Sequence, residues 1–291
     1  MLRPTTYALA FWAFALASAP ARADYIVAGP DTSLAPSSIV WAWDQSQLAP
    51  LRSALDDPVN FGPGGVAPTA ITTVTLGAIN PGVLSGVDAF VSPWWHDADS
   101  AGFHADLLAF FFSGGDLFLL QDDILVAGLG TLLGVTSSNS SGSVSTAGPD
   151  GAPLFNGPFG PVMGVTQAGS MGQLTISAAG ARIGAVNADG EITAAYWLPG
   201  EYAPGAGGLF LLGDVDMLSG PNGGAVFPPG MGANDKGRFG LNLFALAARE
   251  SDAEPVSQIP EPGTITLLAS GLLLLAVRRK ARRRPVAPPG A

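Results

Sequence analysis

The hydrophobic positions between residues 24 and 250 form two alternating patterns. Largely apolar runs stand at residues 25–28, 87–91, 116–120 and 207–214, and their only charged residues are Asp88, Asp116 and Asp214. Between them, apolar residues recur at helical spacing, most clearly at residues 103–112 and 234–248. Strands that are apolar on both faces and alternate with amphipathic helices are typical of a mostly parallel sheet covered on both sides. The pattern therefore predicts an α/β domain over residues 24–250.

Residues 149–204 have a different pattern, rich in Gly, Pro and short alternating runs. Two such runs, residues 183–186 and 192–198, are separated by Asp189-Gly190, a pair that favours the positive φ of a hairpin turn. We expect a β-hairpin-rich insertion here, preceded by a Ser/Gly/Asn loop at residues 137–145. Near the start of the domain, Ser46 is expected to cap the first helix.

The first 23 residues read as a secretory signal peptide. Arg3 gives a positive start, residues 7–17 form an apolar core, and Ala21-Arg22-Ala23 supplies a small-x-small cleavage site. Cleavage between Ala23 and Asp24 is expected. The apolar run is short for a transmembrane helix, so we expect the chain to use the export machinery.

The other end of the chain carries an ordered triplet of segments. Pro260-Glu261-Pro262 precedes an apolar run at residues 265–277, and a basic cluster follows. The cluster is expected to stop transfer and stay on the cytoplasmic side; it consists of Arg278, Arg279, Lys280, Arg282, Arg283 and Arg284. The apolar run spans roughly 20 Å as a helix, against a hydrocarbon core of roughly 30 Å. A short transmembrane helix of this length suits a temporary hold better than a plain anchor.

This triplet resembles the PEP-CTERM sorting signal of exported bacterial proteins. The resemblance implies cleavage near Pro260-Glu261-Pro262 by exosortase, a membrane-embedded protease, after transient anchoring in the inner membrane. We therefore divide the end of the chain into a linker (residues 251–258), a sorting signal (residues 259–284) and a disordered tail (residues 285–291). The implied destination is the cell surface or the extracellular matrix.

The net charge and the lack of cysteine exclude some functions for the domain. Between Asp24 and Glu254 the chain has twenty-two acidic and five basic residues, a net charge near −17. Such a body repels nucleic acid and anionic headgroups, so no nucleic-acid partner is expected. The chain contains no cysteine, which excludes disulfides and thiol catalysis.

The domain also resembles class I glutamine amidotransferase-like domains. The resemblance rests on residues 87–93, on residues 113–123 with the end Gln121-Asp122-Asp123, and on residues 211–216 with residues 240–244. It implies a flavodoxin-like three-layer sandwich. Catalytic members carry a cysteine after the central strand, whereas this chain has none, so the resemblance is to non-catalytic members.

A ligand crevice is expected where the parallel strands end, as in other open α/β sheets. The residues expected there are Trp94, Trp95, His96, Asp97, Gln121, Asp122, Asp123, Asp214 and Asp216. Carboxylates and aromatic rings suit Ca²⁺ or a sugar ring. The alternative is structural: Asp122 caps a helix, Asp214 ends a strand and the tryptophans close the core. We expect the structural use more often than the binding use, and no other cofactor or defined metal site.

Two functions remain open at this point. The first is an exported, non-catalytic surface or matrix protein that binds exopolysaccharide. The second is a secreted hydrolase that cleaves a glycan or ester through carboxylates. A clustered acid pair with one raised pKa favours the hydrolase, and well-paired carboxylates favour the binding protein. Because the chain lacks a cysteine nucleophile and a clear triad, we expect that it is not an enzyme.

Overall fold

The computed structural model divides the chain into two compact units, Met1–Asp252 and Ala253–Ala291. The structure describes residues 24–34, 39–95, 101–121, 128–139, 144–166, 172–220, 224–227, 230 and 233–251. All of these residues belong to the first unit. The signal peptide, the sorting signal and the tail expected from the sequence lie outside the described residues, and so does the expected linker apart from Ser251, which is the last residue of helix α7 (Asp235–Ser251).

Five parallel strands form the centre of the first unit. They are β1 (Tyr25–Pro30), β3 (Ile71–Leu76), β4 (Ala89–Ser92), β6 (Asp116–Leu120) and β15 (Leu209–Leu212). Their order in the sheet is β3-β1-β4-β6-β15, and each neighbouring pair is parallel. Numbered along the chain, this order is 2-1-3-4-5, one of the two common doubly wound orders. The predicted mixed α/β architecture with a parallel sheet is confirmed.

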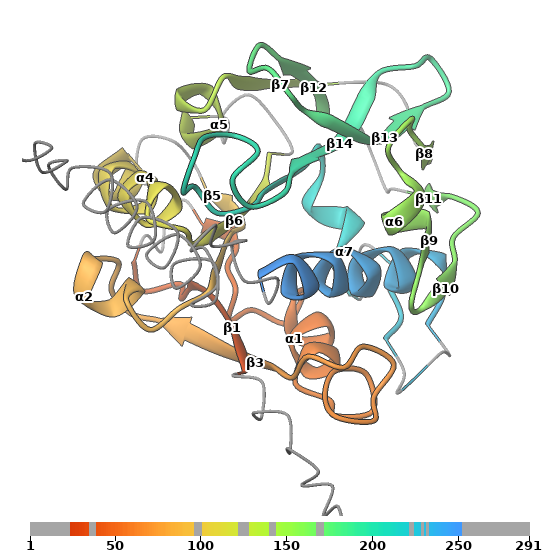
Figure 1. Cartoon of the computed structure of the whole chain (residues 1–291), viewed down its shortest axis with the longest axis horizontal. Coiled ribbons are helices and arrows are strands. Elements are labelled where there is room, and N and C mark those ends of the chain that lie inside the picture. Colours follow the sequence, from red (N-terminus) through yellow and green to blue (C-terminus); the bar gives the residue numbers. More distant parts are fainter. Residues whose placement is uncertain are drawn as a thin grey trace, which may run out of the picture. The chain divides into compact units, whose positions relative to one another are not determined.

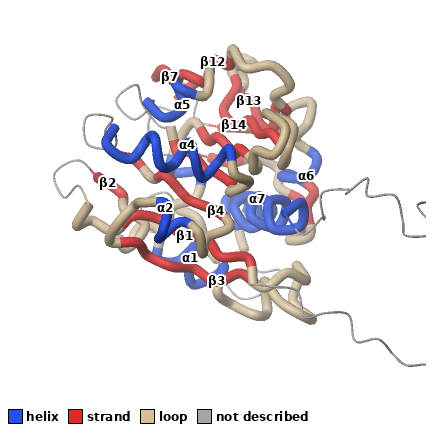
Figure 2. The backbone as a smooth tube through the Cα atoms, turned by 60° about the vertical axis from the view of Figure 1, so that its left-hand side comes forward, coloured by secondary structure: helices blue, strands red, loops and turns tan. Residues whose placement is uncertain are grey.

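Helices cover both faces of this sheet (Figures 1 and 2). One face carries α1 (Ala49–Leu55), α6 (Ala152–Phe155) and α7 (Asp235–Ser251). The other carries α2 (Pro81–Leu84), the short 3-10 helix η1 (Ala101–Phe103), α4 (His104–Phe112) and α5 (Gly128–Leu132). The buried side chains form two clusters accordingly: Phe118 and Leu120 belong to the first, Leu117 and Leu119 to the second. Alternation along a doubly covered strand explains why its sequence is an unbroken apolar run.

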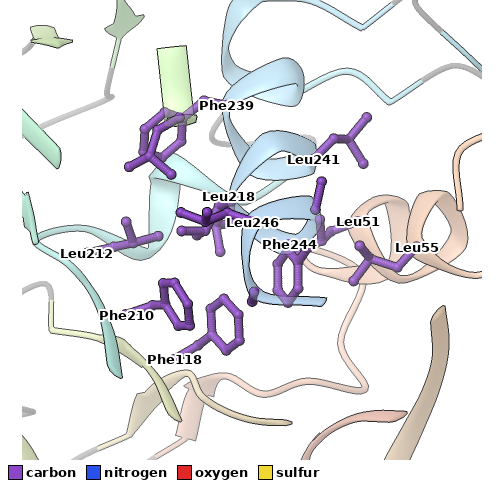
Figure 3. Packing of buried hydrophobic residues seen from close by; sticks show 14 of the residues in the cluster. Leu51, Leu55, Phe118, Phe210, Leu212, Leu218, Phe239, Leu241, Phe244 and Leu246 are labelled. Carbon is purple, nitrogen blue, oxygen red and sulfur yellow. The ribbon is translucent and has the colours of Figure 1, made fainter. Parts of the chain in front are cut away.

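Three stacked phenylalanines join α7 to the sheet. The ring of Phe118 on β6 lies 4.7 Å from that of Phe210 on β15 and 4.5 Å from that of Phe244 on α7. All three side chains are fully buried. Figure 3 shows them among the leucines of α1 and α7. This stack fixes how the last helix lies on the two central strands.

An antiparallel extension continues the sheet beyond β15. Strand β14 (Ile192–Trp197) pairs with β15, and β13 (Arg182–Asn187) pairs with β14 as the predicted hairpin. In the turn of this hairpin, Gly190 has a φ of +79°. The side-chain oxygen of Asn187 accepts hydrogen bonds from the backbone amides of Asp189 and Glu191. The remaining strands of the extension are β7 (Val135–Asn139), β8 (Val144–Ala147), β11 (Val165–Thr166) and β12 (Gly172–Ile176).

Two local expectations are wrong. Residues 137–145 are not one loop, because β7 and β8 occupy most of them and pair with β12 and β13. Ser46 does not cap α1: the N-cap is Leu48, which makes no side-chain cap, and a proline occupies the first turn. Proline fits there because its missing N–H would have no intrahelical partner.

Short elements complete the unit. Strand β2 (Ile39–Trp41) pairs with β5 (Trp94–Trp95), and β9 (Asn156–Gly157) pairs with β10 (Gly160–Pro161). The 3-10 helix η3 (Val215–Met217) follows β15. Within the described ranges, no helix has the length and apolar character needed to cross a membrane. The short transmembrane helix expected at residues 265–277 lies outside those ranges.

Replacing Phe244 by alanine should lower the free energy of unfolding by about 3–5 kcal/mol, because it removes a fully buried ring and leaves a cavity against Phe118. Phe112 is the matched control, since its side chain is 50% exposed. Its replacement by alanine should cost less than about 1 kcal/mol. Urea unfolding of both variants measures the difference, and equal losses would contradict this account of the core.

Candidate functional site

The carboxyl ends of the parallel strands bring together only part of the predicted crevice. His96, Asp97, Asp122 and Asp123 lie outside the described residues. Trp94 and Trp95 form β5 just after β4, and their backbone pairs with β2, in the register Trp94 to Trp41. Asp214 and Asp216 follow β15 and are described in full.

Asp214 has the structural role that the alternative interpretation expected. It is the N-cap of η3, and its Oδ1 accepts the amide of Asp216 at 2.7 Å. The carboxylate is 3% exposed. The turn before it is tight: a Cβ on Gly213 would lie 2.0 Å from the carbonyl oxygen of Gly172, so only glycine fits. Asp214 therefore shapes the end of β15.

Asp216 and Lys236 are residues of opposite charge that are both buried near Asp214. Asp216 is 8% exposed, and its Oδ1 accepts the hydroxyl of Ser219 at 3.0 Å. Burial raises the pKa of Asp216, opposed by the Ser219 bond and by the charge of Lys236. Burial lowers the pKa of Lys236, which is 7% exposed, opposed by the charges of Asp216 and Asp214. We call Asp214, Asp216 and Lys236 the lysine–aspartate cluster.

The two shifts predict opposite pH dependences of stability. Because the pKa of Asp216 is raised by folding, the contribution of Asp216 to the stability of the folded state is greatest in acid, below the ordinary aspartate pKa. This contribution is lost as the pH rises through the raised value. Because the pKa of Lys236 is lowered by folding, Lys236 opposes folding at pH values below the lowered pKa, and this cost is relieved as the pH rises from the lowered value to the ordinary lysine pKa. Where both groups are charged, their burial opposes folding, and their attraction offsets part of that cost.

Sequence reasoning did not single out Lys236. It lies in the first turn of α7, after Asn234, whose Oδ1 accepts the amide of Gly237 at 2.9 Å. A cation in a first turn interacts unfavourably with the helix dipole, and a nearby anion offsets this effect. Lys236 is also one of five basic residues in the acidic body. Those two facts were the signal available in the sequence.

The segment after η3 ties the cluster to α1. The amide of Gly220 donates to the carbonyl oxygen of Gln47 at 2.7 Å. A Cβ on Gly220 would lie 2.5 Å from Pro50, so this approach requires glycine. The lysine–aspartate cluster thus stands where the end of β15 and the starts of α1 and α7 come together. Asp214 accepts a hydrogen bond from the Asp216 amide, and both carboxylates interact electrostatically with Lys236, an arrangement that favours a structural role.

Two buried polar atoms at the same edge have no hydrogen-bond partner among the described residues. They are Oε1 of Gln121, at the end of β6, and Nε1 of Trp43, which packs against Gly29 near the end of β1. These strands lie on either side of β4. The strand order reverses between β1 and β4, where doubly wound sheets bind ligands. The edge therefore offers one acceptor and one donor to a water or a ligand.

Metal ligands are not gathered in the described part of the chain. Across its ranges, no group of three or more His, Cys, Asp or Glu residues has the arrangement of a metal site. Asp97, Asp122 and Asp123, three of the carboxylates in the crevice considered for Ca²⁺, lie outside those ranges. Ca²⁺ binding stays an untested expectation.

Two pockets lie away from the strand ends. The larger, about 580 Å³, runs along α7 and α6. Its buried amide, Asn242, already accepts from the Phe159 amide and donates to the carbonyls of Leu154 and Gly160. The smaller, about 310 Å³, lies between α2 and α4, and we call it the α2–α4 pocket. Both volumes are within or near the range of ligand sites.

Comparison with protein families identifies one segment. Residues 258–283 match the PEP-CTERM protein-sorting motif. The match confirms the sorting signal expected from Pro260-Glu261-Pro262 and the basic cluster. It implies export, sorting to the surface and processing by exosortase. It covers no part of the described domain.

Solved structures show the fold of the domain. The chain is similar to the mmIFT52 N-terminal domain, with 13% identity, a TM-score of 0.51, and coverage of 76% of this chain and 96% of that one. A weaker likeness is to a cytoplasmic protein from Salmonella typhimurium, with 14% identity, a TM-score of 0.44, and coverage of 70% of this chain and 87% of that one. Another is to the exo-beta-1,4-mannosidase Op5Man5 from Opitutaceae bacterium strain TAV5, with 13% identity, a TM-score of 0.40, and coverage of 67% of this chain and 32% of that one. A search of curated proteins found no match. The first likeness shows a shared fold alone.

Replacing Lys236 by methionine should lower the free energy of unfolding by about 3–5 kcal/mol, because buried Asp216 loses the charge that opposes its desolvation. Adding Asp216→Asn should recover part of this loss, with a coupling of about 0.5–3 kcal/mol. Urea unfolding of the wild type, both single variants and the double variant gives the coupling.

Arg249→Met is the control for the loss of a positive charge from α7, because the Arg249 side chain is 69% exposed. It should change the free energy of unfolding by no more than about 0.5 kcal/mol. Strict additivity of Lys236→Met and Asp216→Asn would show that the two side chains do not interact.

Proposed function

We propose that this protein is an exported, exosortase-processed protein of the cell surface or extracellular matrix whose α/β domain binds polysaccharide without catalysis. The sorting motif at residues 258–283 supports the first part of this proposal. The export machinery removes residues 1–23, residues 265–277 hold the chain in the inner membrane for a time, and exosortase then cleaves near Pro260-Glu261-Pro262. The observation that carries the second part is the use of the carboxylates at the strand ends.

The fold favours a non-catalytic, glutamine amidotransferase-like domain of the flavodoxin-like class. Its parallel strands have the order 2-1-3-4-5, and helices cover both faces. Catalytic domains of that family need a cysteine after the central strand. Here Gln121 follows β6, and the chain contains no cysteine. Thiol chemistry is therefore excluded on chemical grounds.

The carboxylates at the strand ends support binding rather than hydrolysis. Asp214 caps η3, and Asp216 accepts from Ser219 beside Lys236. A catalytic carboxylate must reach the substrate, whereas Asp214 and Asp216 are 3% and 8% exposed. Their oxygens are engaged within the protein. This internal use speaks against catalysis by these two carboxylates and is compatible with a non-catalytic domain.

One observation favours the second candidate, a carboxylate-dependent hydrolase. The raised pKa of Asp216, beside another carboxylate, is a feature of general acids. Glycosidases place their two carboxyl groups on opposite sides of a bond, with space for the sugar between them. In this protein Asp214 caps the 3-10 helix η3 and Asp216 lies within it, so the two carboxylates belong to one turn, in which Asp214 accepts a hydrogen bond from the Asp216 amide. We therefore rank hydrolysis second.

Processing has a direct test. Protein recovered from the native host should lack residues 1–23 and the residues beyond Pro260-Glu261-Pro262, because exosortase removes the membrane segment. Intact-mass measurement gives both ends. A variant with Glu261→Ala should keep its basic tail, and Pro255→Ala in the linker is the matched control. A wild-type protein that still carries Arg278 and the residues after it would refute the processing proposal.

Binding and hydrolysis separate in one experiment on the purified protein. Wild type should retain polysaccharides in an affinity assay and release no sugar or ester product over time. Asp122→Asn and Asp216→Asn should leave retention nearly unchanged. Trp94→Ala should weaken it by about 1–3 kcal/mol if the ring stacks on a sugar, a range taken by analogy from base stacking. Turnover that Asp122→Asn or Asp216→Asn abolishes would favour the hydrolase.

A further inference from the structure

The α2–α4 pocket combines an apolar floor with three polar side chains. Its volume is about 310 Å³. Leu84 and Phe110 are buried beneath it, and Ala109 lies on the outer side of α4. The polar side chains are Ser85, Asp106 and Ser113. Helices α2 and α4 contact each other and pack on the same face of the sheet, where Figure 2 shows both.

The polar atoms of this pocket can only accept hydrogen bonds. The Ser85 hydroxyl donates its proton to the carbonyl oxygen of Gly82 at 2.8 Å, and the Ser113 hydroxyl donates to that of Phe110 at 2.8 Å. Their lone pairs remain available. The Asp106 carboxylate has no hydrogen-bond or ion-pair partner among the described residues. A complementary ligand must therefore be rich in donors and should carry a positive charge.

The walls of the pocket are held in place by local structure. Asn80 caps α2, with its Oδ1 accepting the amide of Val83 at 3.1 Å. The Phe110 ring packs so closely on Gly115 that a Cβ there would lie 2.2 Å from it. A preformed pocket loses little conformational entropy on binding. The geometry therefore suits a small rigid ligand.

Asp106 also has a plain structural explanation. It lies in the first turn of α4, where a negative charge is favourable to the helix dipole. That role accounts for a carboxylate at this position in the helix. The two serines are the C-caps of α2 and α4, and their hydroxyls, which keep acceptor capacity, line the same pocket above an apolar floor. The combination points to a ligand.

We propose that the α2–α4 pocket binds an amino-sugar unit of a polysaccharide whose amine is free and protonated. The ammonium group pairs with the Asp106 carboxylate, sugar hydroxyls donate to Ser85 and Ser113, and the apolar face of the ring lies on Leu84 and Phe110. The net charge of the body, near −17, attracts cationic polymers and repels anionic ones. The polysaccharide part of this assignment rests on the proposed function; the positive charge rests on the pocket.

The test is calorimetric titration of the intact protein with glucosamine oligomers and with N-acetylglucosamine oligomers of the same length. The two series differ in the charge of the amine. Wild type should bind the free-amine oligomers at least tenfold more tightly. Asp106→Asn should reduce that affinity about tenfold or more, because the ammonium loses its partner.

Two further variants make the result specific to the pocket. Asp189→Asn removes the same charge from an exposed hairpin turn and should leave affinity unchanged. Ala109→Phe fills the pocket from an exposed helix position and should abolish binding while the thermal unfolding midpoint stays the same. Equal losses in Asp106→Asn and Asp189→Asn would show general attraction to an acidic surface and overturn the proposal.

Two further outcomes would also overturn the amino-sugar site. Equal affinity for both oligomer series, unaffected by Asp106→Asn, would overturn the amino-sugar site and leave polysaccharide binding intact. Failure of every amino-sugar oligomer to bind would overturn the site too. In that case retention of other polysaccharides in the affinity assay shows whether the proposed function fails with it.

Discussion

Burial of the central strands on both faces is the constraint on which this structure depends. Every residue of β6 and β15 is buried, and their side chains enter two separate cores. No polar residue fits within such a strand without a partner, so polar groups are displaced to its ends. Asp116 begins β6 and accepts the Tyr25 hydroxyl and the Gly208 amide, while Gln121 follows it. The chemistry of the sheet is confined to its edges.

The same constraint explains which parts of the fold the sequence predicted. Strands β4, β6 and β15, which are parallel neighbours, were predicted as strands of a mostly parallel sheet because burial on both faces leaves apolar runs that an amphipathic strand does not have. Strands β7 and β8 were missed because they lie in the extension and are rich in serine and threonine, with one side open to solvent in β8. Their pairing with β12 and β13 depends on distant residues. Local composition there indicates only a loop.

The candidate site was less predictable, for a different reason. Asp214 and Asp216 were identified because they directly follow an apolar strand. Lys236 is twenty residues further along, and only the packing of α7 on the sheet brings its charge to them. The α2–α4 pocket depends likewise on two helices separated in the chain by β4. Contacts between elements determine where both sites form, whereas the hydrophobic periodicity of the sequence predicts only the elements themselves.

The two places where a ligand can bind differ in whether their polar groups are already bonded within the protein. At the carboxyl ends of the strands, the described carboxylates cap a turn or face a lysine, so a ligand must compete with bonds already made. Between α2 and α4, the serine hydroxyls have already given their protons to backbone carbonyls, and Asp106 lies in the same lining. Binding there breaks no internal bond. A domain that carries a large negative charge and lacks a thiol can thus recognise a cation on the outer side of a helix layer while its doubly wound centre serves stability.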